Sequence, residues 1–128
     1  MGVTKFSFSG ETLITVPVLV EGVRSTTIVM AIDTGATYTM IPWKIAQSIG
    51  VEPETTKRRI LITTASSTEE APLVTLPRIF VLGKELTQVA AIVHDLPSTS
   101  RIDGLLGLNV LFALRMKIDF AEQVIEIP

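Results

Sequence analysis

The segment Ile32-Asp33-Thr34-Gly35-Ala36 marks an abrupt change in the character of the chain. Before it, Thr26 to Ile32 is a β-branched and apolar run, the composition that favours a strand. Asp, Thr and Gly favour a tight turn instead, so we expect the strand to deliver Asp33 into a loop. Taken alone, this pattern also fits an ordinary turn in which an Asp side chain bonds to its own backbone.

A second segment, Gly104-Leu105-Leu106-Gly107-Leu108-Asn109, follows much later in the chain, directly after Ile102-Asp103. Together the two segments resemble the retroviral-type (retropepsin-like) aspartic proteases and their single-domain bacterial and cellular relatives. That family has an apolar residue and Asp-Thr-Gly-Ala first, and later two apolar residues, Gly, any residue, Asn and a helix. The matching positions of the second motif are Leu105, Leu106, Gly107 and Asn109.

The resemblance extends from about Thr12 to the C-terminal hairpin at Lys117 to Ile127. It implies a mostly β protein with a closed, twisted, barrel-like acid protease fold, one or two short helices, and the architecture of one half of a pepsin-like two-lobed enzyme. It further implies that the second motif packs beneath the catalytic loop and supports it. By resemblance, Asp33 is catalytic, the loop is supported by Thr34, Gly35 and Ala36, and the second-motif support comes from Leu105, Leu106, Gly107 and Asn109.

Peptide hydrolysis by carboxyl groups needs two of them, because one must take a proton from water while the other protonates the carbonyl oxygen. Two carboxyls only a few ångströms apart cannot both ionise, so they share one proton. This chain has one Asp-Thr-Gly, since Asp103-Gly104 lacks the intervening Thr or Ser. We therefore expect an aspartic endopeptidase in which Asp33 from each subunit of a homodimer meets at the two-fold axis. The resemblance implies a peptide or protein substrate, with no cofactor and no metal.

A different class of function stays open, namely a catalytically inactive protease-like dimerisation or peptide-binding module. Such a module should tolerate Asp33→Asn, whereas the carboxyl pair cannot work as amides. Two departures from the family keep this alternative in view. One is at Thr37 and Leu108, where retroviral members often carry an acid and an Arg that form an ion pair near the dimer interface.

The other departure concerns the flap, the β-hairpin that covers the cleft in the family. By order along the chain it would be Leu61 to Pro72, with a possible tip at Ala65, Ser66, Ser67 and Thr68. Family flaps commonly have glycine at the tip, whereas serines stand here. The alternative is an exposed hairpin without a role in substrate binding.

The remaining pattern predicts one domain covering residues 1–128, because 128 residues with 47% hydrophobic content fit one compact core. Alternation of Ile14, Val16, Val18 and Val20 predicts a strand, and Pro17 suggests that it lies near a sheet edge. Further strands are predicted at 59–64, 73–82 and 87–93, short helices at 42–48 and 108–114, and a hairpin that pairs 116–120 with 124–127.

Charge and inventory exclude several classes of function. The formal net charge of −2 offers no basic surface for nucleic acid, and the absence of Cys excludes thiol catalysis and disulfides. No apolar stretch reaches the roughly 20 residues of a membrane span, and the N-terminus lacks the features of a secretory signal, so we expect a cytoplasmic protein. His94-Asp95 with Ser98 and Ser100 could suggest a serine hydrolase, but no nucleophile-elbow sequence accompanies them.

Overall fold

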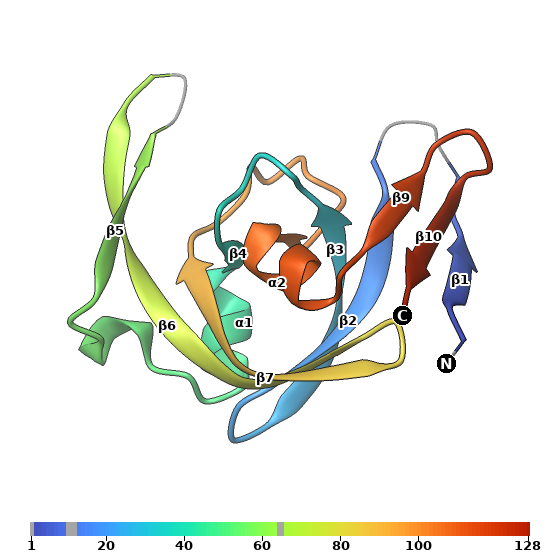
Figure 1. The fold of residues 1–128 in the computed structure, drawn as a ribbon. Coiled ribbons are helices and arrows are strands. Elements are labelled where there is room, and N and C mark those ends of the chain that lie inside the picture. The colour runs from blue at the N-terminus through green and yellow to red at the C-terminus, as the bar shows by residue number, and fades with distance from the viewer. Residues whose placement is uncertain (1, 10–12, 64–65) are drawn as a thin grey trace.

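Most of the chain forms β-strands, and its helices are short (Figure 1). The computed structural model describes residues 2–9, 13–63 and 66–128. Within these residues there are two α-helices, α1 (Trp43–Ser48) and α2 (Leu108–Ala113), and one 3-10 turn, Pro53–Thr55. The strands are β1 (Thr4–Ser7), β2 (Thr15–Glu21), β3 (Ser25–Ile32), β4 (Thr39–Ile41), β5 (Arg59–Thr63), β6 (Thr68–Val81), β7 (Lys84–Val93), β8 (Gly104–Leu106), β9 (Lys117–Asp119) and β10 (Val124–Ile127).

Six strands close into a barrel in the order β2-β3-β8-β4-β7-β6, and β2 pairs with β6 to complete the ring. β8 runs parallel to β3 and β4 runs parallel to β7, whereas the other neighbours are antiparallel. Closure leaves these six strands without a free edge along the paired stretches. The closed barrel with two short helices confirms the predicted fold class.

The alternation in β2 is confirmed, but the prediction of an edge strand is wrong. Val16, Val18 and Val20 are buried, and β2 pairs with β3 on one side and with β6 on the other. Pro17 is accommodated because the β2–β6 ladder begins only at Val18. Its partner in β3, Val29, exchanges its backbone hydrogen bonds with Asp103 on the opposite side. Burial of three valines, each contributing about 1.5–3 kcal/mol, outweighs the ladder bond that Pro17 cannot make.

The core lies inside the barrel and beneath the two helices. α1 contributes Ala46, and α2 contributes Val110 and Leu111. The longest described strands, β6 and β7, cross the lower part of the molecule in Figure 1 and carry buried Leu76 and Val93 into the same core. This packing ties α2 to the barrel, and α2 begins directly after the second motif.

The predicted hairpin at Leu61 to Pro72 is confirmed as a hairpin. β5 pairs with the first part of β6, from Arg59 opposite Pro72 to Thr63 opposite Thr68, and the pair extends away from the barrel (Figure 1). β6 then continues into the barrel, where it pairs with β7 and β2. One continuous strand therefore joins the hairpin to the body of the molecule.

A second, smaller sheet has the order β1-β10-β9. The predicted C-terminal hairpin is confirmed, with Val124 opposite Asp119 and Glu126 opposite Lys117. β1 adds to its outer side, where Thr4 lies opposite Ile127. Buried Ile125 and Ile127 connect this sheet to the barrel core.

Candidate active site

The loop between β3 and β4 holds Asp33 through three backbone hydrogen bonds. The Asp33 N–H donates to the Leu106 carbonyl oxygen (3.0 Å), and the Ala36 N–H donates to the Asp33 carbonyl oxygen (3.2 Å). The Gly35 N–H donates to the carboxylate oxygen Asp33 Oδ1 (2.8 Å). The Asp33 side chain is half-buried while Thr34 and Gly35 are exposed. The carboxylate is therefore fixed at the surface of a braced loop.

β8 lies between the two strands that flank this loop. It pairs with β3 from Met30 opposite Gly104 to Ile32 opposite Leu106, and with β4 at Met40 opposite Leu105. The structure thus brings the second motif directly behind the Asp33 loop, although the two are far apart in sequence.

The start of α2 is bonded to the far side of the same loop. The Leu108 N–H donates to the Ala36 carbonyl oxygen (2.7 Å), and the Asn109 N–H donates to the Thr37 carbonyl oxygen (3.3 Å). Thr37 and Leu108 stand where the family often has an ion pair, and here only backbone groups connect these two stretches. The loop is consequently held by β8 at its start and by α2 at its end.

Asn109 is the centre of a small polar network that sequence reasoning identified only in part. Its Oδ1 accepts hydrogen bonds from the Thr39 N–H (3.0 Å) and from Thr39 Oγ1 (3.0 Å), and its Nδ2 donates to the Ala90 carbonyl oxygen (2.8 Å). Thr39 Oγ1 also accepts from the Gly107 N–H (3.1 Å). Thr39, which is 1% exposed, was missed, and the only signal was a Thr beginning an apolar stretch.

The two glycines of the second motif are required by close backbone contacts. A Cβ at Gly107 would collide with the backbone of Tyr38, and one at Gly104 with the carbonyl of Met40. At Gly35 a Cβ would stand 3.2 Å from Asp33 Oδ1, which is tight. All three glycines therefore allow the two motifs to approach each other or the carboxylate.

Asp103 is a further residue whose position the sequence did not reveal. Its Oδ2 accepts a hydrogen bond from the Val29 N–H (2.8 Å), and its own N–H donates to the Val29 carbonyl oxygen (2.8 Å). These bonds extend the β3–β8 pairing by one position with a side chain in place of a carbonyl. Among the described residues, no second carboxylate is hydrogen-bonded to Asp33.

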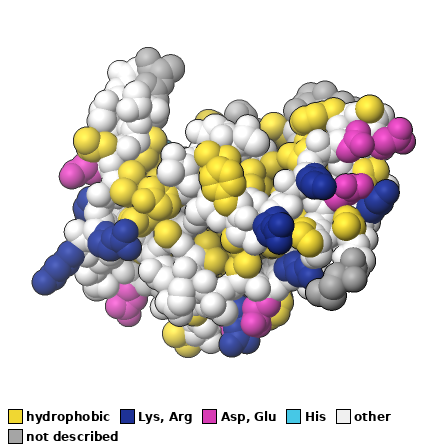
Figure 2. Space-filling model, in the orientation of Figure 1, with side chains coloured by type: hydrophobic (Ala, Val, Ile, Leu, Met, Phe, Trp, Pro, Cys, Tyr) yellow, Lys and Arg dark blue, Asp and Glu magenta, His cyan; other side chains and the backbone are white. Residues whose placement is uncertain are grey.

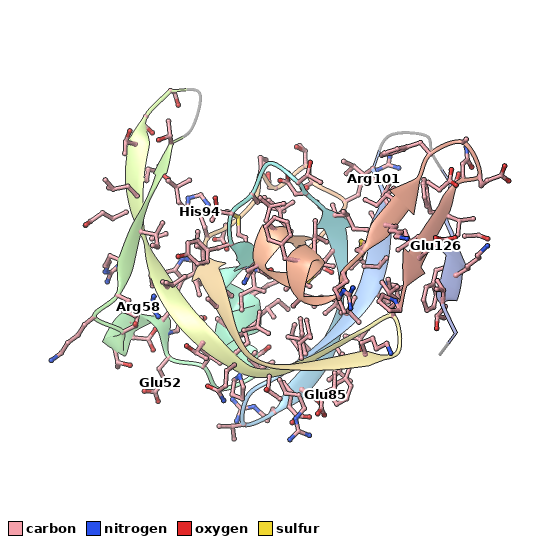
Figure 3. The ribbon with its side chains drawn as sticks, viewed as in Figure 1. Glu52, Arg58, Glu85, His94, Arg101 and Glu126 are labelled. Carbon is pink, nitrogen blue, oxygen red and sulfur yellow. The ribbon has the colours of Figure 1, made fainter. Side chains whose placement is uncertain are left out.

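The His94-Asp95 pair does not form a catalytic triad. His94 Nε2 lies 2.8 Å from Glu69 Oε2 on the β5–β6 hairpin, whereas Asp95 Oδ1 accepts a hydrogen bond from the Trp43 N–H at the start of α1 (3.0 Å). His94 lies between the hairpin and the body of the molecule (Figure 3). In the described part of the chain, no group of three His, Cys, Asp or Glu residues could hold a metal ion.

The possible flap tip is described only in part. Thr68 begins β6 and is exposed, as are Ser66 and Ser67, while Ala65 lies outside the described residues. No helix in the described ranges is both long enough and apolar enough to cross a membrane.

Comparison with known proteins agrees with this geometry. The chain is similar in fold to a retropepsin-like aspartic protease from Rickettsia conorii, with a TM-score of 0.69, 20% sequence identity, and coverage of 98% of this chain and 90% of that chain. A comparison with curated protein sequences gave no match. The aspartyl protease family model matches residues 16–110, which include the Asp33 loop and the second motif as far as Val110. The chain therefore belongs to the aspartyl protease family.

Proposed function

We propose that the chain is an aspartic endopeptidase that works as a homodimer, with Asp33 and the partner subunit's Asp33 as the catalytic pair. The observation that carries the proposal is a half-buried carboxylate on a loop braced by Leu106 and Gly35, with no second carboxylate bonded to it among the described residues. Direct attack by water needs both an acid and a base, so a symmetric second copy supplies the missing group.

The reaction proceeds by proton transfers alone. The ionised carboxylate takes a proton from water while the oxygen of that water attacks the peptide carbonyl carbon, and the protonated carboxyl gives its proton to the carbonyl oxygen. The tetrahedral intermediate then collapses: the carbon–nitrogen bond breaks, the leaving nitrogen receives one proton, and a hydroxyl returns the other to the carboxyl pair. The shared proton is thereby restored, and no covalent intermediate is formed.

The residues around Asp33 have supporting roles in this proposal. Gly35 orients the carboxylate through its N–H, and the exposed Thr34 is free to bond across the dimer axis. The β5–β6 hairpin acts as the flap, with Ser66 to Thr68 near its tip. Two features support that role: the hairpin extends from a barrel strand, and the 2.8 Å contact between Glu69 and His94 connects it to the body of the molecule.

The direct test is cleavage of a diverse peptide pool between about pH 4 and about pH 7, followed by mass spectrometry. Wild type and Asp33→Asn are compared at equal concentration. Cuts made only by wild type are the expected result and would also reveal the sequence preference. A folded, dimeric wild type that leaves the pool intact would favour the peptide-binding module instead.

The rate of cleavage should follow a bell-shaped pH profile. At low pH both Asp33 carboxyls are protonated and the base is lost, and at high pH both are ionised and the acid is lost, so activity falls on either side. Initial rates with one cleaved peptide, measured from about pH 3 to about pH 9, check this expectation.

The matched control for the pH profile is His94→Gln, because histidine is the side chain whose charge ordinarily changes between about pH 5 and 8. Both limbs should remain in this variant, since they belong to the carboxyl pair. A profile that is flat in wild type, or that loses a limb in His94→Gln, would contradict the assignment.

A further inference from the structure

An uncharged groove lies beside the Asp33 loop on the face that carries α2. Its lining consists of Thr34, Leu108, Leu111, Phe112, Met116 and Ile118, and we call it the α2 groove. Figure 2 shows hydrophobic side chains gathered over α2 near the centre of this face. The groove therefore joins the proposed catalytic loop to α2 and β9 without a charged side chain in its lining.

Phe112 stands out within this groove because it is 73% exposed, whereas its neighbour Leu111 is 8% exposed. An aromatic side chain of this size contributes much of its stabilising energy only when it is removed from water. Single exposed apolar residues are ordinary, but one that borders a concave apolar lining is typical of an interaction surface.

We propose that the α2 groove is covered by a second copy of this chain, with Phe112 as an apolar anchor of the homodimer. The inference rests on the proposed function, which leaves the site incomplete until the partner subunit's Asp33 arrives. Thr34 belongs both to the Asp33 loop and to the groove, so a two-fold axis that joins the loops also places the grooves at the contact. No other occupant would complete the site.

The chemistry of the contact follows from the same residues. Leu108 lines the groove where retroviral members often carry an Arg, and its counterpart position is the uncharged Thr37. Apolar contact takes over the role that the ion pair has in those relatives. Because salt screens charges but does not weaken apolar burial, association should not weaken as ionic strength rises.

The test is sedimentation equilibrium of wild type, Phe112→Glu, Phe112→Ser and Val23→Glu. Val23 is 80% exposed at the turn between β2 and β3, and so serves as the matched control for adding a carboxylate at an exposed apolar position. Phe112→Glu should weaken dimerisation by about 100-fold or more, because two-fold symmetry removes the anchor twice. Phe112→Ser should weaken it less, and Val23→Glu should not change it.

Two further readings make the outcome decisive. Wild-type affinity should stay the same or increase between about 0.1 M and about 1 M sodium chloride. Circular dichroism should show the same fold for all four proteins, since both mutated side chains are exposed. The proposal is overturned if Phe112→Glu dimerises like wild type, if salt dissociates the wild-type dimer, or if wild type stays monomeric at about 1 mM.

These outcomes are separable from those that decide the catalytic proposal. A wild-type dimer that Phe112→Glu disrupts, but that shows no Asp33-dependent cleavage, supports the α2 groove and contradicts the protease. Asp33-dependent cleavage with a Phe112→Glu protein that is still dimeric contradicts the groove and leaves the protease standing.

Discussion

Asp33→Asn should lower kcat/KM for peptide cleavage by about 10⁴-fold or more, because an amide can neither take a proton from water nor supply one to the carbonyl oxygen. The fold should survive, since the Asn carbonyl oxygen can still accept the Gly35 N–H bond that Asp33 Oδ1 accepts now. Steady-state kinetics on one defined peptide measure the loss. Urea unfolding and sedimentation on the same samples establish that the variant is folded and associated.

Mixing the two proteins tests whether both carboxyls of one dimer are needed. If each active dimer contains two wild-type chains, activity at constant total chain concentration should fall as the square of the wild-type fraction after subunit exchange. An equal mixture then keeps about one quarter of the wild-type activity. A linear fall, which leaves half, would mean that one Asp33 per dimer suffices and would contradict the shared-proton mechanism.

Asn109→Ala should lower the free energy of unfolding by about 3–5 kcal/mol, which is a large share of the roughly 5–15 kcal/mol typical of a domain. The change removes the acceptor for the Thr39 N–H and Oγ1 and the donor to the Ala90 carbonyl oxygen. Because Thr39 is almost fully buried, water cannot readily replace Asn109 there. Urea unfolding monitored by Trp43 fluorescence, at one fixed chain concentration, measures the effect.

The matched control is Ala113→Ser, an exposed position on the same helix, which should change stability by no more than about 0.5 kcal/mol. A double-mutant cycle with Thr39→Val isolates the contact between the two side chains, and it should give a coupling energy of at least about 0.5 kcal/mol. Additive effects would mean that the network is not a unit. A loss below about 1 kcal/mol for Asn109→Ala would show that the network contributes little to the fold.

Local pattern was enough to predict the parts of this fold that depend on neighbours in sequence. The alternation of Val16, Val18 and Val20 predicts a half-buried strand, and the β-branched run before Asp33 predicts a strand that ends in a turn. The hairpins at both ends of the barrel were predicted for the same reason. Their residues pair across short turns, so the partners are visible in one stretch of sequence.

Three strands escaped prediction because their periodicity is too short to recognise. β1, β4 and β8 have only three or four residues each, and they exist because a partner from elsewhere in the chain pairs with them. The error over β2 has the same origin. Pro17 was correctly seen as unable to donate a ladder bond, but whether β6 would pair beyond it depends on barrel closure.

The sequence by itself determined the family motifs, the strand that carries Asp33, and the glycines at which the backbone had to come close. Only the tertiary structure decided that Thr39 would be the buried partner of Asn109, that Asp103 would bond to Val29, and that Phe112 would face outward beside Thr34. The physical reason is that a side chain's environment is set by what packs against it. In a closed barrel those neighbours come from strands and helices that are distant in sequence.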